Sequence, residues 1–452
     1  MNENQSELLE SNRRDFLRNG SFAALMTMLG GVRLFAQQPA APAAETPAAP
    51  GAKVKVAVIG LGTWGREILS TLHLIDLAGV TAICDTYPAS IRRIASAAPG
   101  AAQTEDYKTI LANKDVSAVI IATPTHQHKE IALAALKAGK HVYCEAPLAN
   151  TIEDAREIAL AAKAAKEQVF QAGLQLRSDP ERRFLLPFIR SGALGTTVMG
   201  RGQWHKKLSW RSTSPNPERE KAINWRLDKS ISLGLIGEVG SHQLDQACWF
   251  LNAHPLSITG FSSLMFWKDG REVPDTAQAI LEFPGGVRMN YDCTLANSFD
   301  ADYDMYYGSD SAVMIRESKA WMFKEADSAL YGWEVYARKD AFYKETGIAL
   351  VADATKLAMR GAKPKEEVPF QDTILSHSLT AFLARCATVD DYHESYGSGD
   401  PEQLTAHLAK SHLAPGAGYL EGFQATVTGI KANEAVTSGQ RLVMKPEWYE
   451  LG

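Results

Sequence analysis

The stretch Lys53-Val-Lys-Val-Ala-Val-Ile59, followed by Gly60-Leu-Gly62-Thr-Trp-Gly65, determines the fold that we expect for this chain. A short apolar run that ends at glycine is typical of a buried parallel strand, and residues 66–72 continue with helical spacing. Strand, glycines and helix in this order predict a dinucleotide-binding turn, with a glycine-rich turn that binds no nucleotide as the alternative. The residues of this turn expected to contact the cofactor are Gly60, Leu61, Gly62, Thr63 and Trp64.

The next predicted strand, residues 80–85, ends in Asp85. A carboxylate at this position accepts hydrogen bonds from the ribose 2′-hydroxyl and repels a 2′-phosphate. The sequence therefore favours NAD over NADP as the cofactor. Arg92 and Arg93 lie nearby in the sequence and would weaken that preference.

Two further predicted strands, residues 116–122 and 141–145, alternate with a predicted helix at 130–138. This alternation indicates a doubly wound α/β sheet, in which ligands bind beyond the carboxyl ends of the strands. The loops that leave these two strands should therefore lie at the cofactor. The residues expected to contact it there are Thr123, Pro124, His126, His128 and Glu145.

The N-terminus has the layout of an export signal. Residues 11–18, SNRRDFLR, place two adjacent arginines before a short apolar stretch, and this core resembles a twin-arginine signal. Residues 37–52 are nearly all alanine and proline, as in a semi-stiff linker. We expect export by the twin-arginine machinery to the periplasm, with an amphipathic N-terminal helix as the alternative. The predicted domains are a signal (1–36), a linker (37–52), a Rossmann domain (53–172) and a substrate domain (173–452).

Composition limits the partners of the chain. Its 452 residues include 45% hydrophobic and 22% charged residues, typical of a soluble globular protein. A net charge of -5, from 47 basic and 52 acidic residues, argues against a nucleic-acid partner. No apolar run reaches the roughly 20 residues that span a bilayer, so no membrane contact is expected in the mature form. Five cysteines are too few for a disulfide framework and are expected to be buried thiols.

Five motifs together resemble the Gfo/Idh/MocA oxidoreductases: GLGTWG at 60–65, the strand-end Asp85, ATPTHQH at 122–128, GKHVYCEAPLA at 139–149 and GEVGSHQLD at 237–245. The resemblance covers most of the chain from Lys53 onward. It implies a Rossmann domain, an α+β domain built on a large, mostly antiparallel sheet, and a sugar or polyol bound between them. One departure is important, because the family's Glu-Lys-Pro is Glu145-Ala146-Pro147 here, without the lysine usually assigned to proton transfer.

Glu238, His242, Asp245 and Trp249 are spaced by four, three and four residues, so on one helix they would share a face. Such a polar stripe is costly against an apolar core and fits a cleft better. The resemblance assigns substrate contact and proton handling to His242 and Asp245, and places Glu238 where the family has Asp. A solvated helix face is the alternative. We predict no metal site, because no second histidine lies at ligand spacing.

The cluster His205-Lys206-Lys207-Leu-Ser-Trp210-Arg211 suits a sugar, since indole faces pack on sugar C–H groups while Lys and Arg donate to hydroxyls. A solvated basic turn is an equally good interpretation. Lys206 or Lys207 is the first candidate to replace the missing lysine as catalytic base, and Asn224-Trp225-Arg226 is a similar grouping. The expected substrate-binding residues are His205, Trp210, Arg211, Trp225 and Glu238.

The remaining sequence predicts scaffold. A hairpin at 277–283 and 287–295, strands at 303–307, 312–316 and 321–324, surface loops at 331–372, and helices at 375–386 and 418–435 are expected.

Three functions remain open from the sequence. One is an NAD-dependent oxidoreductase with tightly bound cofactor, acting on a ring carbinol of a sugar, polyol or glycoside and assembling as a homo-oligomer. Another is a redox-cycling glycoside hydrolase that oxidises, eliminates, hydrates and reduces with no net use of NAD. A third is a sugar-binding protein without activity, which Ala146 keeps open.

Overall fold

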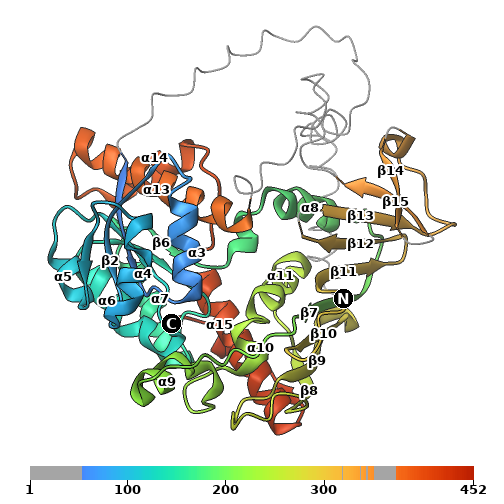
Figure 1. Ribbon diagram of the computed structural model, residues 1–452. Helices are drawn as coiled ribbons and strands as arrows, with labels where there is room; N and C mark the ends of the chain where they lie inside the picture. The colour runs from blue at the N-terminus through green and yellow to red at the C-terminus, as the bar shows by residue number, and fades with distance from the viewer. Residues whose placement is uncertain (1–52, 318, 336, 343–344, 351–372) are drawn as a thin grey trace, which may run out of the picture.

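The computed structural model describes residues 53–350 and 373–452, except 318, 336, 343 and 344. The predicted signal and linker, and the part of the predicted loop from 351 to 372, lie outside the described residues. The described chain builds two sheets with helices between them (Figure 1).

The first sheet has six strands in the order β3-β2-β1-β4-β5-β6, and all of its pairs are parallel. The order reverses between β1 and β4, which is where doubly wound sheets bind their ligands. The predicted α/β fold and its strands are therefore confirmed. The elements are β1 (Val54–Ile59), α3 (Thr63–Leu72), β2 (Ala78–Cys84), α4 (Pro88–Ile94), β3 (Ala102–Thr104), α5 (Tyr107–Ala112), β4 (Ala118–Ile121), α6 (His128–Lys137), β5 (His141–Cys144), α7 (Ile152–Ala164) and β6 (Phe170–Ala172).

Helix α13 (Ile374–Tyr396) returns from the far end of the chain to pack on this first sheet (Figure 1). His141 Nε2 lies 3.0 Å from Asp390 Oδ1, and the Tyr143 hydroxyl lies 3.1 Å from Ser378 Oγ. The helix is longer than the predicted 375–386, and α14 (Pro401–Lys410) follows it. No pattern in the sequence indicated that this late helix completes the first domain's apolar core.

The second sheet has ten strands in the order β14-β15-β13-β12-β11-β7-β10-β9-β8-β16. Among the described strands only β7 and β10 pair in parallel, so the expected mostly antiparallel sheet is confirmed. The strands are β7 (Thr197–His205), β8 (Ser257–Ser263), β9 (Thr276–Glu282), β10 (Arg288–Thr294), β11 (Asp302–Gly308), β12 (Ser311–Arg316), β13 (Lys319–Lys324), β14 (Lys339–Phe342), β15 (Glu345–Leu350) and β16 (Leu442–Val443).

The prediction of loops throughout 331–372 is wrong for β14 and β15, which extend the large sheet. In β15 the buried residues are Gly347 to Leu350, and only the last three have apolar side chains, so its apolar signal is three residues long. A run that short does not distinguish a strand from a loop.

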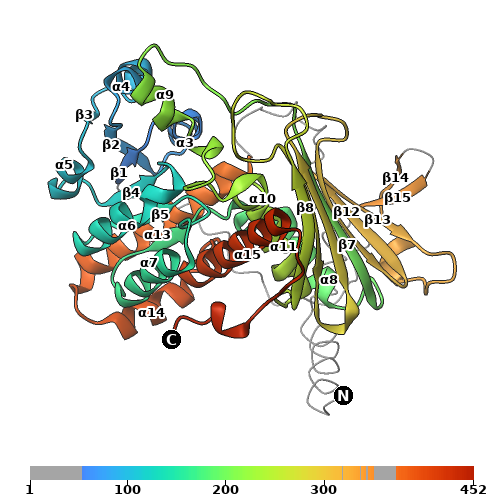
Figure 2. The ribbon, with the colours of Figure 1, turned by 90° about the horizontal axis from the view of Figure 1, so that it is seen from below.

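Helices cover one face of the large sheet and separate it from the Rossmann sheet (Figure 2). They are α8 (Pro180–Arg190), α10 (Gly234–Glu238), α11 (Ser241–Leu251) and α15 (Tyr419–Ser438). All five cysteines are buried and unpaired, as expected. Within the described residues, no helix combines the length and apolar character needed to cross a bilayer.

Candidate active site

In the glycine turn after β1, each of the three glycines has its own structural role. Gly60 has φ +95, and a Cβ there would meet the carbonyl oxygen of Ala122 at 2.6 Å. A Cβ on Gly65 would lie 1.9 Å from the Gly60 oxygen, so the helix can pack this closely only with glycine. Around Gly62, in contrast, the space is open within 4 Å, and α3 begins there without a side-chain cap. Uncapped N–H groups facing open space suit a pyrophosphate.

Three buried polar atoms near this turn lack hydrogen-bond partners: Thr123 Oγ1, His126 Nδ1 and Glu145 Oε1. They follow the carboxyl ends of β4 and β5, where the sequence predicted cofactor contacts. Buried polar groups are rarely left unsatisfied, so unpaired atoms beside open space indicate a ligand site. The residues present therefore fit a dinucleotide, and the predicted group is brought together here. Its other members also lie at this edge of the sheet: Leu61, Thr63, Trp64 and Pro124.

Asp85 lies beside the glycine turn and is held by backbone donors. Its Oδ2 accepts from the Leu61 N–H at 2.9 Å, and its Oδ1 accepts from the Tyr87 N–H at 2.8 Å. An unpredicted residue also reaches it, because Arg219 Nη2 lies 3.9 Å from Asp85 Oδ1. The Arg219 guanidinium stands 4.5 Å from the Tyr87 ring centre, and its Nη2 donates to Ser90 Oγ at 3.4 Å.

Arg219 belongs to α9 (Pro217–Ile223), which comes from the second half of the chain and lies beside α4 (Figure 2). The sequence signal near Asp85 was a different pair, Arg92 and Arg93, and both of these are exposed on α4. No local pattern could have identified Arg219, because it approaches Asp85 only through the tertiary fold.

His128 has a structural role rather than the predicted cofactor contact. It is buried, and its Nδ1 and Nε2 lie 3.0 and 2.9 Å from the carbonyl oxygens of Pro147 and Thr123. Burial lowers the pKa of this imidazole to about 4. The neutral ring has one N–H and donates to one of these two oxygens, and its position between them places His128 between the loops that leave β4 and β5.

Glu145 lies at the end of β5 with 7% of its surface exposed. Burial raises the pKa of its carboxyl to about 7, while the Trp64 side chain and the Ala146 backbone donate to the carboxylate and oppose this shift. The neighbouring Ala146 side chain is apolar, so Glu145 is the titratable group of this loop.

Replacing Glu145 with glutamine is expected to make the stability of the nucleotide-free protein less sensitive to pH. The native pKa of about 7 lies above its ordinary value of 4.5, so wild-type stability falls as pH rises between these values. The variant lacks this loss. Its free energy of unfolding, relative to that of the wild type, should therefore rise by roughly 3 kcal/mol from pH 4.5 to pH 7 and then stay constant. Urea unfolding across this range measures it, and a difference independent of pH would contradict the prediction.

His242 lies in the first turn of α11 and is half-buried. Among the described residues its ring has no hydrogen bond or ion pair, and burial lowers its pKa to about 4. The imidazole is therefore neutral at pH 7 and free to accept a proton from a bound molecule.

Asp245 does not orient this imidazole, since it forms a two-pronged ion pair with Arg177. The Nε–Oδ2 and Nη2–Oδ1 distances are 2.8 and 2.9 Å. The single helix face expected for Glu238, His242 and Asp245 is also corrected. Glu238 ends α10, and α11 begins only at Ser241, so these residues lie on two helices joined by Val239 and Gly240.

Glu238 is buried and links the two domains. Its Oε2 accepts from the Thr125 hydroxyl at 3.0 Å, across from the loop after β4, and its Oε1 accepts from the Leu233 N–H at 3.0 Å. Glu238, which was predicted to bind the substrate, therefore holds α10 against the Rossmann domain.

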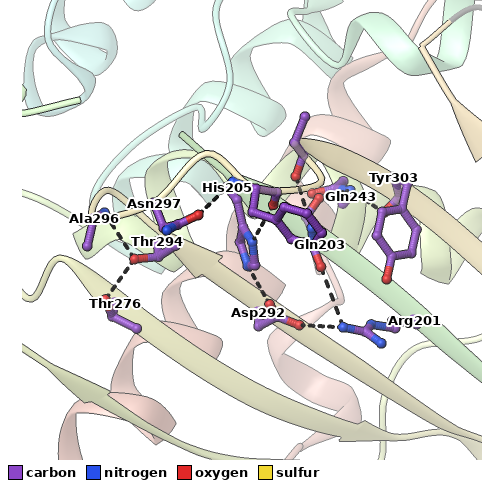
Figure 3. A network of polar contacts seen from close by, with 12 residues as sticks. Arg201, Gln203, His205, Gln243, Thr276, Asp292, Thr294, Ala296, Asn297 and Tyr303 are labelled. Carbon is purple, nitrogen blue, oxygen red and sulfur yellow. Dashed lines mark hydrogen bonds and ion pairs between the residues drawn. The ribbon is translucent and has the colours of Figure 1, made fainter. Parts of the chain in front are cut away.

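The basic cluster after β7 is dispersed. His205 Nε2 pairs with Asp292 Oδ2 at 2.6 Å, and its Nδ1 lies 3.2 Å from the Phe299 carbonyl oxygen, within a network on the large sheet (Figure 3). Arg211 pairs with Asp269 at 3.1 Å. Lys207 Nζ stands 4.8 Å from the Phe266 ring centre. Lys206 is exposed, and its ammonium has no partner among the described residues.

Two predicted tryptophans, Trp210 and Trp225, both lie beside the Arg226 guanidinium. The Arg226 guanidinium carbon lies 4.4 Å from the Trp225 ring centre and 5.8 Å from that of Trp210. The Trp225 ring also contacts His126 edge to face, with centres 5.9 Å apart. We call Trp210, Arg226, Trp225 and His126 the aromatic ladder. It connects the second domain to the loop after β4.

No group of three or more His, Cys, Asp or Glu side chains in the part of the chain that the structure describes is arranged to hold a metal ion.

Comparisons with known proteins agree with this architecture. A model described as the oxidoreductase family with an NAD-binding Rossmann fold matches residues 54–173, and a GFO/IDH/MocA C-terminal domain matches residues 186–313. Together they cover more than half of the chain, which belongs to the Gfo/Idh/MocA family of oxidoreductases.

Two curated relatives illustrate the group. A levoglucosan dehydrogenase from Pseudarthrobacter phenanthrenivorans is 36% identical over 145 residues, which cover 32% of this chain and 35% of that protein. An inositol 2-dehydrogenase from Saccharopolyspora erythraea is 26% identical over 238 residues, which cover 52% of this chain and 65% of that protein. The matches thus span from about a third to just under two thirds of the relatives' length.

A solved structure of levoglucosan dehydrogenase in complex with NADH and levoglucosan has the same fold. It aligns with a TM-score of 0.63 and 19% sequence identity, covering 86% of this chain and 99% of that one.

Proposed function

We propose that this protein is an NAD-dependent dehydrogenase that oxidises a ring carbinol of a sugar, polyol or glycoside and keeps its cofactor tightly bound. The proposal rests on one combination of features. His242 is neutral and has no partner among the described residues. The predicted cofactor site has open space around Gly62 and buried polar atoms of Thr123 and Glu145 without partners. The names of the two relatives, levoglucosan dehydrogenase and inositol 2-dehydrogenase, support this class of substrate.

The residues divide the work as follows. A bound nicotinamide supplies the hydride acceptor for the carbinol carbon. His242 accepts the hydroxyl proton at a ring nitrogen, since its imidazole is neutral at pH 7. The Glu238–Thr125 hydrogen bond keeps α10, and with it the start of α11, against the loop after β4. Lys206 is the remaining candidate for the missing lysine, because Lys207 is held by Phe266.

The test begins with the purified protein. It is denatured and the released nucleotide is quantified, and then the intact protein is given a panel of polyols, sugars and aryl glycosides. Formation of reduced nicotinamide in proportion to oxidised sugar supports the proposal. Release of the aglycone with no net reduction of NAD would mean a redox-cycling hydrolase instead, and a protein that binds no nucleotide would rule out both.

Replacing Arg219 with alanine is expected to weaken NAD retention by about tenfold, the equivalent of about 1.4 kcal/mol. Arg219 reaches Asp85, Tyr87 and Ser90 from α9, so it closes the second domain over the ribose end of the predicted site. Nucleotide content after gel filtration, together with a fluorescence titration of the stripped protein, measures the effect. The exposed Arg92→Ala is the matched control, and equal retention in both variants would argue against a closing role.

We propose further that the chain is exported to the periplasm already folded, since its Arg13-Arg14 motif resembles a twin-arginine signal. Fractionation of cells that produce the wild type or Arg13→Lys/Arg14→Lys tests this, because the double variant should stay in the cytoplasm.

A further inference from the structure

Arg226 stands out because its hydrogen-bonding capacity is unused. The Arg226 side chain forms no hydrogen bond or ion pair with any of the described residues. Two nearby arginines differ, since Arg211 and Arg271 both pair with Asp269, at 3.1 and 2.6 Å. An arginine presents five N–H donors in a planar fork, and none of those of Arg226 has an acceptor among the described residues. The two indoles of the aromatic ladder, 4.4 and 5.8 Å from its guanidinium carbon, leave these donors available to a ligand.

Glu238, the carboxylate that attracts Arg226 electrostatically, does not accept hydrogen bonds from these donors. Glu238 is buried, and its two oxygens already accept from Thr125 and Leu233. Arg226 itself remains exposed to solvent, although enough protein surrounds it that burial lowers its pKa. A guanidinium that solvent can reach, with two indoles close by, is better suited to binding a ligand than to pairing with a carboxylate of the protein.

The position of Arg226 places it by the proposed reaction site. Trp225, its neighbour in the chain, contacts His126, which follows β4 and has an unpaired Nδ1. Glu238, the acid that attracts Arg226, lies four residues before His242 and bonds the loop after β4. Through Trp225 and Glu238, Arg226 is thus linked to the loop after β4, which belongs to the proposed cofactor site.

We infer that Arg226 is a specificity-determining residue that binds an oxyanion carried by the substrate, so that the natural substrate is an acidic sugar or a sugar ester rather than a neutral sugar. Two indoles lie close to the guanidinium, and its unpaired N–H donors match a carboxylate, sulfate or phosphate in a two-pronged pairing. The inference rests on the proposed function and names the substrate class of that site.

The test measures binding to the nucleotide-loaded protein by tryptophan fluorescence and calorimetry, independently of turnover. Probes are sets matched in ring stereochemistry, each with the neutral sugar, its uronate and its 6-phosphate, for the gluco, galacto and manno series. In at least one set we expect the wild type to bind an anionic member at least tenfold more tightly than the neutral one. Uronate preference would identify a carboxylate, and phosphate preference an ester.

In Arg226→Gln this preference should fall below threefold, while Arg226→Lys should retain part of it. The control is the exposed Arg288→Gln on β10, which should keep the wild-type preference. Equal binding of neutral and anionic members in every set, or a preference that survives Arg226→Gln, would overturn the inference. Oxidation of neutral sugars would continue in that case, so the proposed function would stand, whereas loss of nucleotide binding would be a failure of the proposed function.

Discussion

Replacing His242 with asparagine is expected to lower kcat by roughly 100- to 10,000-fold, the usual contribution of a positioned general base. The imidazole has no protein partner among the described residues, so the substitution removes a proton acceptor without breaking an internal contact. Nucleotide content and thermal stability should therefore stay close to those of the wild type. Steady-state kinetics on any oxidised substrate measures the loss.

The pH profile gives a second readout of the same group. His242 must be neutral to accept a proton, and burial lowers its pKa to about 4. We expect kcat/KM to fall only as pH drops toward that value, and not near pH 6.5, the ordinary pKa of histidine.

Lys206→Met provides the comparison. If Lys206 were the base, this variant would lose as much activity as we expect for His242→Asn. A large loss in Lys206→Met with near-normal turnover in His242→Asn would thus transfer the role to the lysine.

The sequence could predict the first domain because its signals are local. The turn from Gly60 to Gly65 requires glycine because of neighbours within a few residues or just after the adjacent strand β4: a Cβ on Gly65 or Gly60 would lie 1.9 or 2.6 Å from a backbone oxygen. The buried parallel strands are continuous apolar runs for the same reason. The hairpin of β9 and β10 was likewise visible, because Gly285 and Gly286 lie between two alternating strands.

The candidate site was harder to predict, because its geometry depends on residues far apart in the chain. Residue types and spacing identified His242, yet the spacing rule assumed one continuous helix, whereas α10 ends at Glu238 and α11 begins at Ser241. Arg219 reaches Asp85 from the other domain, and no pattern in either segment indicates that contact.

The polar side chains of the basic cluster illustrate a different limit. His205 and Arg211 have the right chemistry for a sugar, but each has an aspartate within ion-pair distance, Asp292 and Asp269. Whether a polar side chain is free or paired is a property of the tertiary structure. The fold brings Asp269 to Arg211, but it brings no described carboxylate within ion-pair distance of Arg226.

Replacing Asp245 with alanine is expected to destabilise the protein by about 3–5 kcal/mol, the cost of breaking a buried ion pair on one side. The Asp245 and Arg177 side chains are 4% and 16% exposed. Without the aspartate, Arg177 would remain buried beside Arg183, and the two guanidinium groups repel each other. Urea unfolding of the nucleotide-free protein measures the loss.

The double variant Arg177→Met/Asp245→Leu distinguishes a structural pair from a catalytic one. If Asp245 acts through its pairing with Arg177, removing both charges should restore most of the stability, as replacement of buried ion pairs by apolar residues often does. Turnover should then return with the fold, because His242 is still present. A double variant that is stable but has lost activity to the extent of His242→Asn would show that Asp245 handles protons itself, as the family resemblance implies.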